Sequence, residues 1–131
     1  MMKKLLISGV VFSSTGVMLG ALGAHELKEQ LDASQLASFE TGVRYQLFHG
    51  LALMVVALIP VLSNSVKNLV FWFFVVGLVL FSGSIYGLST QAITGTKLSF
   101  LGPVTPVGGL LLILGWLFIL FKLFQFKTTK D

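Results

Sequence analysis

Four stretches that are each long and apolar enough to cross a lipid bilayer dominate this sequence. They span residues 5–24, 43–62, 69–89 and 105–124. A hydrocarbon core about 30 Å thick requires roughly 20 apolar residues in a helix. Backbone polar groups in lipid must be hydrogen-bonded internally, and these continuous runs lack the alternation of barrel strands. The sequence therefore predicts an all-α membrane protein, a four-transmembrane-helix bundle that forms one domain over residues 1–131.

Composition excludes several other classes of protein. The chain is 55% hydrophobic and 11% charged, against about 25% charge in a soluble domain. Its net charge of +4 comes from 9 basic and 5 acidic residues, and the basic ones form no groove-sized patch for nucleic acid. The chain contains no Cys, so thiolate metal sites and Cys nucleophiles are excluded. We expect membrane lipids as partners, no nucleic acid and no cofactor, and the sequence indicates no particular protein partner.

The longest connection, residues 25–42, also has a helical pattern. Its apolar residues recur at helical spacing; they are Leu27, Leu31, Leu36, Phe39 and Val43. Asp32 with Gln35 three residues later matches a capping box. We therefore predict an amphipathic, interfacial helical segment here, with a helix that starts near Ala33 and continues into the second stretch.

Two other features concern helix ends and the amino terminus. Thr105 followed by Pro106 is typical of an N-cap with proline at the first helical position, which predicts the start of the fourth helix. Lys3 and Lys4, followed by an apolar run that ends at Ala24, resemble a secretory signal peptide. That run is longer than a usual signal core, so we expect a retained first span.

The distribution of Lys and Arg predicts the orientation. Four spans place both chain ends on one side, together with Lys3, Lys4, Lys67, Lys122, Lys127 and Lys130. The opposite side has Lys28, Arg44 and Lys97. Because an excess of Lys and Arg marks the cytoplasmic side, we expect both termini in the cytoplasm.

Polar residues of the spans are concentrated in the half that this orientation places outside. Gly42, Tyr45, Gln46 and His49 share one helix face. An amide or imidazole that faces lipid unpaired is costly, so these side chains should turn inward. We expect a contiguous cavity or hydrogen-bonded knot that binds a ligand or joins the helices; its members are His25, Tyr45, Gln46, His49, Ser84, Tyr86 and Thr105.

Small residues also form stripes along the predicted spans. They are Ser13, Gly16, Gly20 and Gly23 or Ala24 in the first, Gly83 and Gly87 in the third, and Gly108, Gly109 and Gly115 in the fourth. Small residues let helix backbones approach closely in lipid. We interpret the stripes as packing within one bundle, with homo-oligomer formation through one of them as the alternative. Trp116, next to Gly115, is interpreted as a packing residue.

Four short runs, one for each span, resemble a known family. They are residues 20–25 (GALGAH), 42–49 (GVRYQLFH), 81–86 (FSGSIY) and 105–109 (TPVGG), the last leading to Gly115 and Trp116. In order and over nearly the whole chain, they are similar to the signatures of domain-of-unknown-function family 423, the YgdD/YwdK type of small bacterial inner-membrane protein. The resemblance implies a multi-pass inner-membrane protein without an established activity, and it supplies no catalytic residues.

The function is open between several hypotheses. The first is a structural, partner-binding or membrane-integrity role in which the polar cluster joins helices. The alternative is a binding site for a lipid headgroup or small polar ligand in the outer-leaflet half. A proton-coupled transporter is disfavoured because the four stretches contain no Asp or Glu, and a channel of several copies is less favoured than binding.

Catalysis and metal binding are the least favoured. Ser82 or Ser84 with His49 could pair a nucleophile with a base, but the spans provide no acidic residue to orient the base. His25, His49 and Glu26 lack the spacing of a metal motif. We therefore expect a protein that is not an enzyme and has no metal site.

Overall fold

The computed structural model describes residues 1–127 and contains the four long helices that the sequence predicts. They are α1 (Met2–Leu22), α3 (Ala33–Leu58), α4 (Asn64–Ser89) and α6 (Val104–Gln125). Each is long and apolar enough to cross a membrane, which confirms the all-α membrane fold. Lys130, one of the residues used for the orientation, lies outside the described part.

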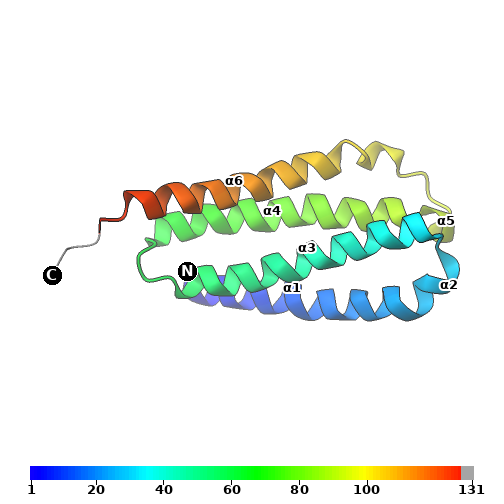
Figure 1. Cartoon of the computed structure of the whole chain (residues 1–131), viewed down its shortest axis with the longest axis horizontal. Coiled ribbons are helices and arrows are strands. Elements are labelled where there is room, and N and C mark those ends of the chain that lie inside the picture. The colour runs from blue at the N-terminus through cyan, green and yellow to red at the C-terminus, as the bar shows by residue number, and fades with distance from the viewer. Residues whose placement is uncertain (128–131) are drawn as a thin grey trace.

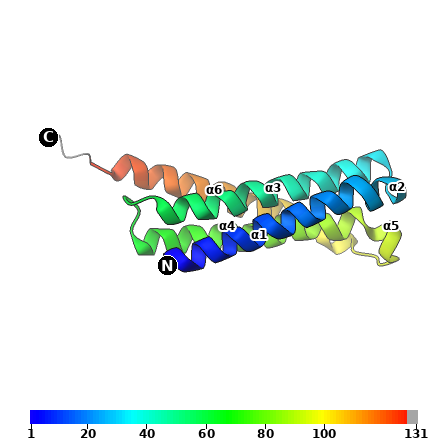
Figure 2. The same cartoon turned by 90° about the horizontal axis from the view of Figure 1, so that it is seen from below.

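The helices run antiparallel, and each packs mainly on the next in the order α1, α3, α4, α6 (Figure 1). One end of the bundle holds the start of α1, the end of α6 and the α3–α4 connection; we call it the proximal end. The other holds the short helices α2 (Lys28–Gln30) and α5 (Gln91–Thr94) and is called the distal end (Figure 2).

The two central helices bury more of their surface than the two outer ones. In the most apolar part of each helix, 50% of α3 and 39% of α4 is buried, against 17% of α1 and 22% of α6. Leu5, Leu53 and Phe74 are fully buried in the largest apolar cluster. The outer helices therefore leave broad apolar faces, as expected for helices in contact with lipid.

The connection from α1 to α3 is almost entirely helical. A π-helical turn, η1 (Gly23–Leu27), and α2 extend α1, so the chain reverses only at Leu31 and Asp32. The Asp32 side chain accepts the Gln35 N–H at 2.8 Å, and Gln35 Oε1 accepts the Asp32 N–H at 3.0 Å. This confirms the capping box and the helix start at Ala33.

The apolar residues that predicted this helical connection pack together. Leu27, Leu31, Phe39 and Val43 form a second, smaller buried cluster. Its members come from η1, the reversal and the first turns of α3, so the connection is fixed to the bundle by apolar packing.

The predicted N-cap at Thr105 is wrong. Between α4 and α6 the chain passes through α5 and a 3₁₀ turn, η2 (Ser99–Leu101), and α6 begins at Val104 with Pro103 as its N-cap residue. Pro106 then lies within the first turn, where its missing N–H removes no helical hydrogen bond. Thr105 is left inside the helix, and its hydroxyl is directed to α4 instead.

Glycines bring two pairs of helices into backbone contact. A Cβ added at Gly9 of α1 would lie 2.5 Å from Met54 Cγ and 2.6 Å from the Gly50 carbonyl oxygen of α3. A Cβ added at Gly108 of α6 would lie 2.7 Å from the Gly77 carbonyl oxygen of α4. These are crossings that only glycine permits without displacement of a helix.

The glycine stripes expected from spacing are only partly used for packing. A Cβ added at Gly20 would meet only Val43 Cγ1, at 3.3 Å, and one added at Gly83 would meet nothing within 4 Å. Packing of α1 on α3 depends on Gly9 and Gly16 rather than on Gly16 and Gly20. A separation of seven residues returns to the same helix face after two turns.

Candidate functional site

Gln46 joins three helices through its amide group. Its Nε2 donates to the Phe12 carbonyl at 3.0 Å and to Thr15 Oγ1 at 2.8 Å, both on α1. Its Oε1 accepts the hydroxyl of Tyr86 on α4 at 2.6 Å. With both donors and one acceptor used and the side chain 5% exposed, Gln46 holds α3 to α1 and to α4.

Two serines of α4 make further contacts between helices. Ser82, which is buried, donates to the Gly42 carbonyl of α3 at 2.7 Å. Ser84 Oγ lies 2.6 Å from Thr105 Oγ1 of α6. The polar residues of the distal half thus form separate hydrogen bonds between neighbouring helices.

Both ring nitrogens of His49 have a partner. Nδ1 lies 2.8 Å from the Tyr45 carbonyl oxygen, and Nε2 lies 3.1 Å from Nε1 of Trp116 on α6. A carbonyl only accepts and an indole N–H only donates. The pattern therefore assigns the neutral tautomer in which Nδ1 carries the hydrogen, and it leaves no ring nitrogen for a ligand or a proton transfer.

The side chains of the other two predicted site residues, Tyr45 and His25, take no part in these hydrogen bonds. Tyr45 is exposed, and its ring packs against Phe81 with centroids 4.9 Å apart. His25 lines a separate distal hollow of about 500 Å³ with Glu26 and Lys28. The structure thus groups Gln46 with Tyr86, His49 with Tyr45, and Ser84 with Thr105, while His25 stays separate.

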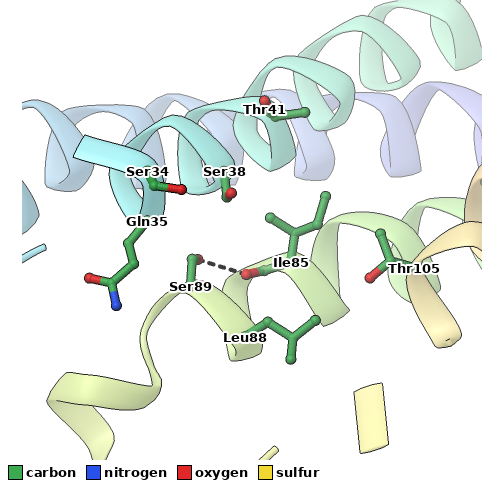
Figure 3. Close-up of a pocket in the computed structure, with 8 residues that line it drawn as sticks. All are labelled: Ser34, Gln35, Ser38, Thr41, Ile85, Leu88, Ser89 and Thr105. Carbon is green, nitrogen blue, oxygen red and sulfur yellow. Dashed lines mark hydrogen bonds between the residues drawn. The ribbon is translucent and has the colours of Figure 1, made fainter. Parts of the chain in front are cut away.

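A cavity of about 420 Å³ lies at the distal end, between α3, α4 and α6 (Figure 3). It is lined by Ser34, Gln35, Ser38, Thr41, Ile85, Leu88, Ser89 and Thr105. Its volume falls within the range of about 300–1,000 Å³ typical of small-molecule sites. Thr105 is the one lining residue among the seven predicted for the site.

The other polar lining residues were missed because only the apolar face of this helical segment was used in the prediction. Ser34, Ser38 and Thr41 are spaced by four and three residues, so they share one face of α3. The signal was available in the sequence directly after the capping box. Hydroxyls at helical spacing that follow a cap predict a polar helix face.

The lining of the distal cavity combines uncharged polar side chains with two apolar ones. Five hydroxyls and one amide provide both donors and acceptors. Ser89 donates to the Ile85 carbonyl at 2.6 Å, and Thr41 donates to the Ala37 carbonyl at 3.0 Å. Ile85 and Leu88 add an apolar side. Such a surface suits a polar group that is attached to an apolar body.

Metal binding has no support from the described residues. Within residues 1–127, no three His, Asp or Glu side chains are grouped so that they could hold an ion. The two ring nitrogens of His49 are already hydrogen-bonded. The polar groups that line the distal cavity are hydroxyls and one amide.

Four apolar helices that are fastened by polar residues in one half define a small helical membrane protein. The chain belongs to a family described as "Protein of unknown function (DUF423)", whose model matches residues 19–109. It is 37% identical over 125 residues to a UPF0382 membrane protein of Staphylococcus haemolyticus, covering 95% of this chain and 98% of the relative.

Two further relatives come from other bacteria. The UPF0382 membrane protein YwdK of Bacillus subtilis is 38% identical over 120 residues, covering 90% of this chain and 94% of that protein. A UPF0382 membrane protein of Haemophilus influenzae is 36% identical over 112 residues, or 86% of each chain. No solved structure matches this chain.

Proposed function

We propose that this protein is a non-enzymatic, multi-pass protein of the bacterial inner membrane whose distal cavity binds the polar headgroup of an outer-leaflet lipid or a small ligand of the same chemistry. The observation that carries this proposal is the cavity itself, which combines five hydroxyls from α3, α4 and α6 with two apolar residues of α4. Both termini are cytoplasmic in this proposal, so the cavity faces the outer leaflet.

The depth of the cavity supports a headgroup rather than an acyl chain. Ser34 is the second residue of α3, and Ser89 is the last residue of α4. Helix ends lie near the interfacial region, where headgroups are found. Ile85, one turn deeper than Ser89, would contact the start of the acyl chains.

The contacts of the possible catalytic residues support a non-enzymatic role. His49 has both nitrogens bonded, and Ser84 is paired with Thr105. A serine hydrolase needs a histidine nitrogen that is available to the serine hydroxyl. The hydrogen bonds of these residues instead hold helices together.

Replacement of a lining hydroxyl by a bulky apolar side chain tests the binding proposal. We expect the leucine side chain in Ser38→Leu to fill the cavity. The variant should therefore lose the lipid or small molecule that the wild type retains during gentle purification. Native mass spectrometry measures the retained mass. The matched control is Ser14→Leu on α1, because Ser14 is exposed and donates only to its own helix, at the Val11 carbonyl. Wild-type retention in Ser38→Leu would overturn the proposal.

A purely structural role is the second candidate, and the bonds of Gln46 favour it. That residue fastens α3 to α1 and α4 without any ligand. In this case Ser38→Leu has no effect on retained molecules or on a cellular phenotype, while Gln46→Leu causes loss of folded protein.

The orientation has its own test. The native chain contains no Cys, so a single Lys97→Cys substitution introduces one label site on the α5–α6 connection. We expect a membrane-impermeant thiol reagent to label it from the periplasmic side in intact cells. The control is Ser65→Cys at the proximal end, on the same side as Lys67, which should be labelled only after the membrane is opened. The reverse pattern would contradict cytoplasmic termini.

A further inference from the structure

A second cavity, of about 280 Å³, lies at the proximal end between the start of α4 and the end of α6. Its lining residues are Val61, Leu62, Ser63, Val66, Lys122, Gln125 and Phe126. It differs from the distal cavity because a charged side chain lines it. Lys122, which is half-buried, donates from Nζ to Gln125 Oε1 at 3.2 Å. That partner is neutral, the rings of Phe118 and Phe121 lie 5.5 and 5.6 Å from Nζ, and within residues 1–127 no carboxylate is paired with Lys122.

Charge is strongly asymmetric between the two ends of the bundle. Of the carboxylate side chains in residues 1–127, all lie at the distal end, on η1, on α2 or near the start of α3; they are Glu26, Glu29, Asp32 and Glu40. At the proximal end, the charged side chains of the described residues are all cationic; they are Lys3, Lys4, Lys67, Lys122 and Lys127. A proximal anion would therefore meet positive potential and no carboxylate from the described chain.

Lys67 is a second cation at the proximal end, although it does not line this cavity. It lies one residue after the lining residue Val66, it is 8% exposed, and its Nζ donates to the Ala57 carbonyl of α3 at 2.9 Å. A carbonyl neutralises little of an ammonium charge, and in a region of low dielectric constant that charge acts over a longer distance than in water.

We infer that the proximal cavity binds the phosphate group of an anionic phospholipid, with Lys122 as the contacting cation and Ser63 and Gln125 as hydrogen-bonding neighbours. Basic pockets between transmembrane helices are suited to anionic headgroups. The apolar members of the lining, Val61, Leu62 and Phe126, would contact the lipid near its glycerol. This site is separate from the distal cavity, so either can fail without the other.

Lipid competition on the full chain tests this inference. The purified protein is equilibrated with equal amounts of phosphatidylglycerol and phosphatidylcholine, and native mass spectrometry measures the lipids that remain bound. We expect a severalfold preference for phosphatidylglycerol in the wild type. Lys122→Gln should remove most of that preference, and Lys122→Arg should keep it because the positive charge is retained.

Two controls make the outcome specific. Lys97→Gln removes one positive charge from the distal side and should leave the preference unchanged. Gln125→Glu places a carboxylate beside Lys122 at an exposed position, so it should abolish the preference without unfolding the helix. Thermal unfolding of each variant confirms that the bundle is intact.

The contrary outcomes are equally clear. A wild-type preference in both Lys122→Gln and Gln125→Glu would overturn the inference, and so would an equal loss in Lys97→Gln. Excess inorganic phosphate should not displace the bound phosphatidylglycerol. Its displacement would mean that the cavity takes a free anion rather than a lipid. Binding at the distal cavity, which Ser38→Leu tests, is unaffected by each of these results.

Discussion

The distal and proximal halves of the bundle are held together by different interactions. In the distal half, Gln46 bonds to Tyr86 and to α1, and Ser82 bonds to the Gly42 carbonyl. In the proximal half, apolar side chains such as Leu5 and Leu53 are fully buried, and Gly9 brings α1 against α3. Because lipid is as apolar as leucine, burial alone does not drive helices together in a membrane. The proximal half relies mainly on close fit, with one bond from Lys67 to the Ala57 carbonyl, whereas the distal half has several directional bonds beside its smaller apolar cluster.

This difference explains where the larger hydroxyl-lined cavity lies. Close fit leaves little space, whereas hydrogen bonds can hold helices at fixed positions around a gap. The distal cavity lies beyond the bond between Ser84 and Thr105 and includes Thr105 in its lining.

The largest expected effect is at the proximal crossing. We expect Gly9→Leu to destabilise the bundle by about 3 kcal/mol, the upper part of the usual cost of overpacking. The added side chain meets Met54 and the backbone of Gly50, and the latter cannot rotate away. Thermal unfolding in detergent measures the change. Gly83→Leu is the matched control, since a Cβ there meets nothing within 4 Å. Equal losses in both would mean that close fit does not hold the proximal half.

The distal counterpart is Gln46→Leu, which removes three hydrogen bonds at nearly constant volume. At about 0.6 kcal/mol for each bond in a membrane protein, the expected loss is about 2 kcal/mol. Tyr86→Phe removes only one of the three, so it should cost about a third as much in the same unfolding assay. A Gln46→Leu variant as stable as the wild type would remove the distinction between the two halves.

Lys67→Met should have a smaller effect of about 1 kcal/mol. The substitution keeps the length of the side chain but removes the ammonium group that bonds to the Ala57 carbonyl in the last turn of α3. Hydrogen exchange of the last turn of α3 is the sharpest readout, because fraying should increase there and not at the distal end. Faster exchange along the whole helix would argue against a local capping role.

The smallest effect is expected for His49→Gln. Glutamine can still accept the Trp116 N–H, so the loss of stability should stay within about 0.6 kcal/mol, the value of one such bond. Retention of a ligand in the distal cavity should equal that of the wild type, because His49 does not line that cavity. A lost ligand with unchanged stability would place His49 in the binding site.

Local features of the fold could be predicted from the sequence. The capping box of Asp32 and Gln35 was predictable because its partners are three residues apart. The pairing of Gln46 with Tyr86 followed in part from depth, since antiparallel helices place both residues at a similar level.

Features that depend on the rotation of one helix against another could not be predicted. The bond from Trp116 to His49 requires a particular face of α6 to meet α3. The role of Gly9 was missed because small residues were sought four positions apart, whereas α1 uses Gly9 and Gly16. The distal cavity is formed by residues of three helices together, so its hydroxyls on α3 alone do not define it.

The most direct test of a binding function at the distal end is an experimental structure of the protein in a lipid nanodisc. We expect non-protein density in the distal cavity, with a polar group within hydrogen-bonding distance of Ser34, Ser38 or Thr41 and an apolar part along Ile85 and Leu88 (Figure 3). A cavity closed by its own side chains, or occupied by water alone while lipid density lies elsewhere, would contradict it.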